Sequence, residues 1–114
     1  MSMISGVGID IIGIKRIEDA ARRFGKKFFN RIYTDKEILY CLSNNPPFEK
    51  LAGRFAAKEA VLKALGTGWE QNVSFKSVEI LNDNRSRPVV YLHDKAAEIA
   101  SELISYKISV SITH

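Results

Sequence analysis

One segment near the middle of the chain, from Gly53 to Leu65, limits the possible folds more than any other. It is rich in alanine and leucine, it contains no proline, and Val61 is its only β-branched residue. This composition predicts an α-helix, which we expect to begin near Phe48 and to end at the glycines of the Gly66-Thr67-Gly68 segment.

The predicted helix has two different apolar faces. At about 100° per residue, the large apolar side chains form one stripe and the alanines form a second side. The stripe suits packing against a core, and the alanine side allows close approach of another backbone. The stripe consists of Leu51, Phe55, Leu62 and Leu65, and the alanine side of Ala56, Ala57, Ala60 and Ala64.

Charged residues lie at the edges of this stripe and within it. Glu59 and Lys63 are one turn apart at one edge, Arg54 is near the other edge, and Lys58 falls inside the stripe. The simplest interpretation makes Glu59 and Lys63 an exposed pair that contributes about 0.2–0.5 kcal/mol. Lys58 would then lay its stem on apolar surface and extend its ammonium group into water.

The N-terminal segment from Met3 to Ile14 is a predicted buried strand that contains one charge, Asp10. A carboxylate in such surroundings must be paired, hydrogen-bonded, bound to a metal or protonated. A lysine of the central helix is one possible partner. The alternative is a magnesium ion held by Asp10 and Glu59 beside Lys63, because magnesium usually takes one or two carboxylates together with phosphate oxygens and waters.

Composition limits the class of protein. With 114 residues and 46% hydrophobic composition, the chain can form one domain around one core, and we expect a single-domain α+β fold. Cys41 is the only cysteine, so an internal disulfide is excluded. No apolar run approaches the roughly 18 residues of a membrane span, and the N-terminus lacks the layout of a signal peptide. These features predict a cytoplasmic protein.

The net charge of +4 is unevenly distributed. Residues 15–31, which we call the basic segment, hold seven lysines or arginines and two acidic residues, a net charge of +5. Such a segment favours an acidic partner, which could be nucleic acid, an anionic membrane or an acidic protein. A solvated face is the alternative.

Local patterns predict the other elements. Apolar spacing indicates a short helix that ends at Gly25, followed by a connecting segment that Phe28 and Phe29 anchor to the core. Thr34 and Glu37 fit a capping box at the start of the next helix, so we assign Glu37 a structural role. The remaining predictions are a loop over 43–47, a strand over 73–81 with a bulge near 76–77, a turn over 82–87, a strand over 88–92, a helix over 95–103 that begins at Asp94, and a strand over 107–112.

Four segments carry a family resemblance, in order along nearly the whole chain. They are GVGIDIIGIKRIE (6–18), FFNRIYTDKEI (28–38), RFAAKEAVLKALGTG (54–68) and SVSITH (109–114). Together they resemble the holo-[acyl-carrier-protein] synthases of the 4′-phosphopantetheinyl transferase superfamily. The resemblance implies one transferase domain over 1–114, with an antiparallel sheet packed against the long central helix. Related chains usually continue into another strand after the last motif, so we expect that residues are absent from this sequence after His114, and also at the connection around Ile104 to Tyr106, which has no glycine cap.

The resemblance further implies transfer of 4′-phosphopantetheine from coenzyme A to a serine of apo acyl carrier protein, in fatty acid biosynthesis, with release of adenosine 3′,5′-bisphosphate. Asp10 and Glu59 would hold magnesium, and Lys63 would stabilise the phosphoryl oxygens. The base would be Glu59 or a metal-bound water. The phosphates of coenzyme A would contact Arg54, Lys58 and His114, and further contacts would come from Gly66, Ser111 and Thr113.

The implied protein partner is acidic, and we expect it to dock on the basic segment through Arg16, Arg22, Arg23 and Lys26. The resemblance also implies a homotrimer with the active site between subunits, without a membrane or nucleic acid as partner. Two alternatives stay open: a small basic nucleic-acid-binding module, for which residues 15–31 would be the footprint, and a structural α+β domain in which Asp10 pairs internally.

Overall fold

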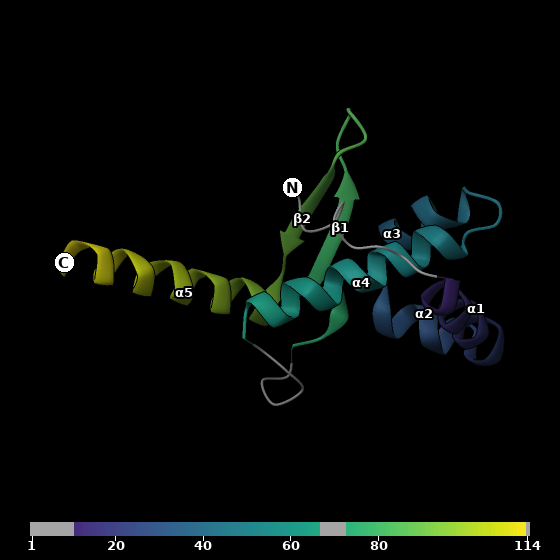
Figure 1. Ribbon diagram of the computed structural model, residues 1–114, viewed down its shortest axis with the longest axis horizontal. Coiled ribbons are helices and arrows are strands. Elements are labelled where there is room, and N and C mark those ends of the chain that lie inside the picture. The colour runs from purple at the N-terminus through teal and green to yellow at the C-terminus, as the bar shows by residue number, and fades with distance from the viewer. Residues whose placement is uncertain (1–10, 67–72, 114) are drawn as a thin grey trace.

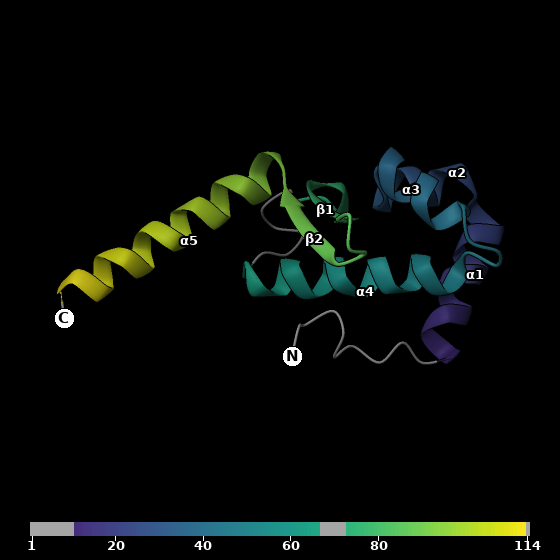
Figure 2. The same ribbon diagram turned by 90° about the horizontal axis from the view of Figure 1, so that it is seen from above.

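The long helix α4 lies at the centre of the fold, with three helices at its N-terminal end and a β-hairpin across its middle (Figures 1 and 2). The computed structural model describes residues 11–66 and 73–113. Their elements are α1 (Ile11–Phe24), α2 (Lys26–Ile32), α3 (Asp35–Leu42), α4 (Phe48–Ala64), a 3₁₀ turn η2 (Phe75–Ser77), β1 (Val78–Asn82), β2 (Pro88–Leu92) and α5 (Asp94–Thr113). The predicted α+β fold, with an antiparallel sheet against a long central helix, is confirmed.

Helix α4 joins two clusters of buried side chains. Leu51 and Ala52 belong to the cluster formed with α1, α2 and α3, and Ala57 belongs to the cluster formed with β1 and α5. The predicted stripe therefore packs as expected, since Phe55 adjoins the first cluster and Leu62 adjoins the second. Because both clusters share α4, the position of this helix depends on both.

The three N-terminal helices follow the sequence signals closely, with one difference. Gly25 has a φ of 56°, a backbone conformation that favours glycine, and it separates α1 from α2. The capping box of Thr34 and Glu37 is confirmed at the start of α3. Phe28 and Phe29 do pack against the core, but they lie in helix α2 instead of a connecting segment. Both rings contact Tyr33, the residue that directly follows α2.

The hairpin has the predicted turn and second strand, but its first strand begins at Val78 instead of residue 73. Asn82 pairs with Pro88 and Val78 pairs with Leu92. The Asp83 side chain accepts hydrogen bonds from the backbone N–H groups of Arg85 and Arg87, which fixes the turn. The expected bulge near 76–77 is wrong, since the chain forms the 3₁₀ turn η2 there before the strand begins.

Two predicted strands are wrong where the structure describes them. Residues 11–14 begin helix α1, in which Ile14 and Ile17 are one turn apart and both pack on the core. Residues 3–10 of that predicted strand lie outside the described residues. Residues 107–112, with the preceding connection, continue helix α5 to Thr113. A helix satisfies its own backbone hydrogen bonds, whereas a strand at either place needs a partner strand.

No helix in the part of the chain that the structure describes combines the length and the apolar character that crossing a membrane requires.

Candidate functional site

Glu59 and Lys63 lie on α4 one turn apart, and both side chains are exposed. Successive residues of a helix are about 100° apart, so these two side chains leave the helix within about 40° of each other. The expected ion pair between them is wrong: within residues 11–66 and 73–105, no salt bridge joins the two. A carboxylate and an ammonium group therefore face solvent from one side of α4.

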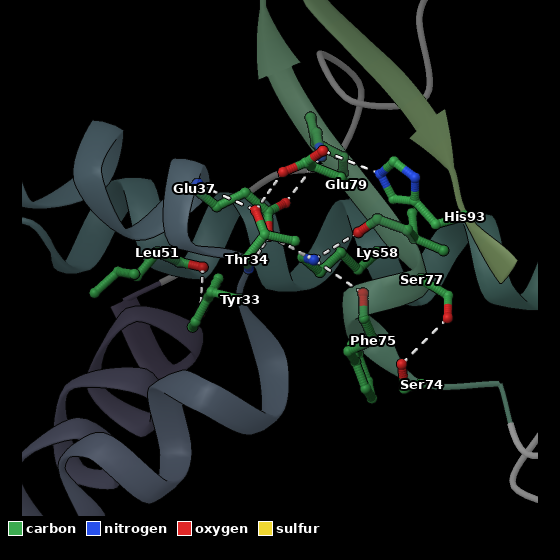
Figure 3. A network of polar contacts seen from close by, with 12 residues as sticks. Tyr33, Thr34, Glu37, Leu51, Lys58, Ser74, Phe75, Ser77, Glu79 and His93 are labelled. Carbon is green, nitrogen blue, oxygen red and sulfur yellow. Dashed lines mark hydrogen bonds and ion pairs between the residues drawn. The ribbon is translucent and has the colours of Figure 1, made fainter.

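The neighbouring Lys58 differs from its sequence-based interpretation. Its side chain is fully buried, so the expectation that its ammonium group reaches water is wrong. The Nζ atom lies 2.7 Å from Glu37 Oε1 and donates hydrogen bonds to the backbone oxygens of Phe75 and Val78 (Figure 3). An ammonium group has three hydrogens, and these three partners use them all. Lys58 consequently has no donor left for a phosphate of coenzyme A.

Glu37, which faces Lys58, is also fully buried. Its carboxylate accepts hydrogen bonds from the backbone N–H groups of Thr34 and Ile80, each at 2.8 Å. The structural role that the capping box predicted is confirmed, and the ion pair adds to it. Burial lowers the pKa of Lys58, and the hydrogen bond and charge of Glu37 act in the opposite direction. The pair thus connects α3, α4 and β1 inside the core.

A second carboxylate, Glu79 on β1, extends this polar network (Figure 3). It accepts a hydrogen bond from the Thr34 hydroxyl and lies 3.0 Å from Nε2 of His93. Burial by itself would raise the pKa of Glu79, but the bonds from Thr34 and His93 outweigh it and lower the pKa. Sequence reasoning missed both Glu79 and His93. The only hint in the sequence was an acidic residue between two apolar residues, Val78 and Ile80, in a predicted strand.

Arg54 is almost fully buried and connects three elements. Its guanidinium lies 4.6 Å from the centroid of the Tyr40 ring on α3 and donates to Asn82 Oδ1 at the end of β1. The Arg54 Nε atom has no hydrogen-bond partner among the described residues. Stacking and the bond to Asn82 hold this side chain inside the protein, so it differs from an exposed phosphate ligand.

The other candidate residues are only partly covered by the structure. Gly66 follows α4 with a φ of 69°, as a terminating glycine should. Ser111 and Thr113 lie in the C-terminal end of α5, which extends away from α4, so the structure does not bring them to Glu59 (Figures 1 and 2). Asp10 and His114 are outside the described residues.

The basic segment presents the predicted cations on its surface. Arg16, Arg22, Arg23 and Lys26 are all exposed, on α1 and at the start of α2. Arg22 pairs with Glu18 at 2.9 Å, and its guanidinium lies over the Phe48 ring at the start of α4. This contact places the basic segment beside the N-terminal end of the helix that carries Glu59.

Comparison with known proteins agrees with the resemblance seen in the sequence. The family model described as 4′-phosphopantetheinyl transferase superfamily matches residues 6–111. A holo-[acyl-carrier-protein] synthase of Protochlamydia amoebophila is 46% identical over 98% of this chain and 89% of the relative. The crystal structure of the holo-[acyl-carrier-protein] synthase of Neisseria meningitidis is 37% identical, with a TM-score of 0.66 over 81% of this chain and 73% of that chain.

An acyl carrier protein synthase of Plasmodium yoelii, solved with ADP bound, is 31% identical, with a TM-score of 0.62 over 78% of this chain and 69% of that chain. The family match spans α1 to α5 and includes the segment of α4 that carries Glu59 and Lys63. The chain therefore belongs to the 4′-phosphopantetheinyl transferase superfamily, as its four motifs indicate.

Proposed function

We propose that this protein is a holo-[acyl-carrier-protein] synthase, which transfers 4′-phosphopantetheine from coenzyme A to a serine of apo acyl carrier protein. The observation that carries the proposal is the family match over residues 6–111, which covers both the exposed Glu59 and the exposed Lys63 of α4. The synthases of P. amoebophila and N. meningitidis support the same activity by their similarity over most of the chain.

The reaction exchanges one phosphorus–oxygen bond for another. The serine oxygen bonds to the phosphorus nearer the pantetheine, and the bond from that phosphorus to the bridging oxygen breaks, which releases adenosine 3′,5′-bisphosphate. Lys63 stabilises the phosphoryl oxygens as their negative charge grows in the transition state. The serine proton goes to the Glu59 carboxylate or to water. Both side chains leave α4 on the same exposed side, which suits one reacting group.

Magnesium fits the donor chemistry of this site. Asp10 and Glu59 would hold it, and Glu59 is exposed with no salt bridge to another described residue. When bound, magnesium supplies charge neutralisation for the diphosphate. Of the predicted contacts to coenzyme A, we retain Lys63, Gly66 and His114; Ser111 and Thr113, which α5 carries away from Glu59, would have to come from a neighbouring subunit. Lys58 and Arg54 have structural partners instead, as described above. The P. yoelii synthase, solved with ADP, supports a site for the nucleotide half of coenzyme A.

The carrier protein docks on the basic segment in this proposal. Acyl carrier proteins are acidic, and Arg16, Arg22, Arg23 and Lys26 are exposed cations next to α4. Exposed charges of opposite sign steer association and set the orientation of the partner. The carrier would thus bind beside the N-terminal end of α4, with Glu59 about three turns along the same helix.

We also infer a cytoplasmic homotrimer with its active site between subunits. Exposed apolar surface is often covered in an assembly, and β2 and α5 carry such surface. Its side chains are Val90, Tyr91, Leu103 and Ile104. Light scattering on the purified protein tests the number of subunits. The mass of a trimer is expected, and the mass of a monomer would contradict the inference.

Mass spectrometry of apo acyl carrier protein tests the proposed activity. After incubation with this protein, coenzyme A and magnesium, the carrier should gain the mass of one phosphopantetheine group. A carrier whose acceptor serine is replaced by alanine should gain none. An unmodified apo carrier after complete incubation would refute the proposal.

A further inference from the structure

We infer that the buried pair of Glu37 and Lys58 is a positioning device for the transfer reaction: it fixes the rotation of α4 so that Glu59 and Lys63 face the reacting groups together. This inference rests on the proposed function. Neither residue of the pair touches substrate, since both side chains are completely buried. They act through the helix that carries the chemical groups.

The three bonds of Lys58 reach three different elements. Its Nζ atom contacts Glu37 on α3 at 2.7 Å, the backbone oxygen of Phe75 on η2 at 2.9 Å and the backbone oxygen of Val78 on β1 (Figure 3). Glu37 in turn accepts the backbone N–H of Ile80 on β1. Because hydrogen bonds are directional, this arrangement determines how far α4 can turn about its own axis.

The chemical groups are close to this fixed point. Glu59 directly follows Lys58 and leaves the helix about 100° from it, and Lys63 leaves about 140° from it. A group at the outer radius of a helix, about 5–6 Å from the axis, moves by about 1 Å when the helix rotates by about 10°. A misplacement of that size can reduce the rate of an enzyme about 100-fold.

A charged pair at this place needs an explanation beyond stability. Removing two charges from water is costly, and apolar residues of similar volume often replace a buried pair without loss of stability. Apolar contacts, however, permit small rotations that a directional pair does not. The pair satisfies backbone groups of α3, η2 and β1, and its directional bonds fix the orientation of α4 as well.

The test compares the double variant Glu37→Leu with Lys58→Met against the unmodified protein. Apolar replacement of both partners leaves no buried charge, but the backbone groups of Thr34, Ile80, Phe75 and Val78 lose their side-chain partners, so the unfolding temperature should fall and the assays are run well below it. The kcat for phosphopantetheine transfer should fall about 100-fold. The calorimetric Kd for coenzyme A and its KM should stay within about twofold, since the pair makes no contact with it. Lys50→Met removes an exposed lysine of α4 and should change none of these values.

A second variant covers the case in which the double variant does not fold. Lys58→Arg keeps the charge that faces Glu37 but changes the directions of its N–H groups. It should lower kcat at least about tenfold, with coenzyme A affinity unchanged.

Three results would overturn the inference. They are an unchanged kcat in a folded variant, a kcat that falls only in proportion to the folded fraction seen by near-ultraviolet circular dichroism, and a weaker affinity for coenzyme A at unchanged kcat. The last result would instead make Lys58 a substrate contact. Absence of transfer by the unmodified protein would refute the proposed function, and the inference with it.

Discussion

Replacing Glu37 by glutamine should destabilise the protein severely, because it leaves the Lys58 ammonium buried without a counter-charge. Both side chains are fully buried and their charged atoms are 2.7 Å apart. Removing one partner of a buried pair costs about 3–5 kcal/mol. The backbone N–H groups of Thr34 and Ile80 also bond to this carboxylate, and an amide has one oxygen to offer in place of two. Because domains are stable by about 5–15 kcal/mol, the loss is a large part of the total.

Urea denaturation at neutral pH measures this loss, and the chain offers a matched control. Glu18→Gln removes the same charge from the exposed pair with Arg22, whose ionic atoms are 2.9 Å apart. An exposed pair is worth about 0–1 kcal/mol, so this variant should unfold almost as the unmodified protein does. The two substitutions differ only in burial and in the partners of the carboxylate.

The size of the difference decides whether the reasoning is right. If Glu37→Gln lowers the free energy of unfolding by less than about 1 kcal/mol, the buried pair is not a paired charge of the kind described. A loss as large for Glu18→Gln would equally contradict the explanation, since burial would then not be its cause. Adding Lys58→Met to Glu37→Gln should recover part of the stability, because the uncompensated charge is then absent.

Three further predictions concern the site and its surroundings. Lys63→Ala should lower kcat more than it weakens coenzyme A binding, because its charge matters most in the transition state; stopped-flow kinetics and calorimetry separate the two. Replacing Arg16 and Arg23 by glutamate should raise the KM for carrier protein and flatten its salt dependence at unchanged coenzyme A affinity, which steady-state kinetics at low and high salt would show. Glu79→Gln should reduce the acid sensitivity of folding: the pKa of Glu79 is lowered in the folded protein, so its stabilising effect is present above the pKa of an unfolded glutamate and is lost as the pH falls through the folded value. Thermal unfolding of both proteins at a series of pH values from neutral to acidic measures this loss of stability.

The elements with local signals could be predicted from the sequence. The composition of α4 predicts a helix, and the Thr34 and Glu37 spacing predicts the start of α3. The turn residues between β1 and β2 likewise predict the hairpin. In each case the residues that determine the structure are neighbours in the chain, so the pattern contains the information.

Contacts between distant residues could not be predicted in the same way. Glu37 and Lys58 are separated by a loop and by most of two helices, and a lysine inside an apolar stripe indicates only that its ammonium group needs some partner. The alternation of Ile108, Val110 and Ile112 is typical of a strand, yet these residues continue α5. A strand depends on a partner that the alternation itself does not specify.

The most direct test of the proposed chemistry measures phosphopantetheine transfer by Glu59→Gln and Asp10→Asn in limiting magnesium. Each substitution removes a carboxylate proposed to hold the ion, so each variant should stay folded and lose most of its transfer rate. Glu102→Gln, an exposed glutamate of α5, is the matched control and should retain the full rate. Mass spectrometry of the carrier protein over time gives the three rates. Full transfer by either site variant, beside a normal control, would contradict the assignment of this site.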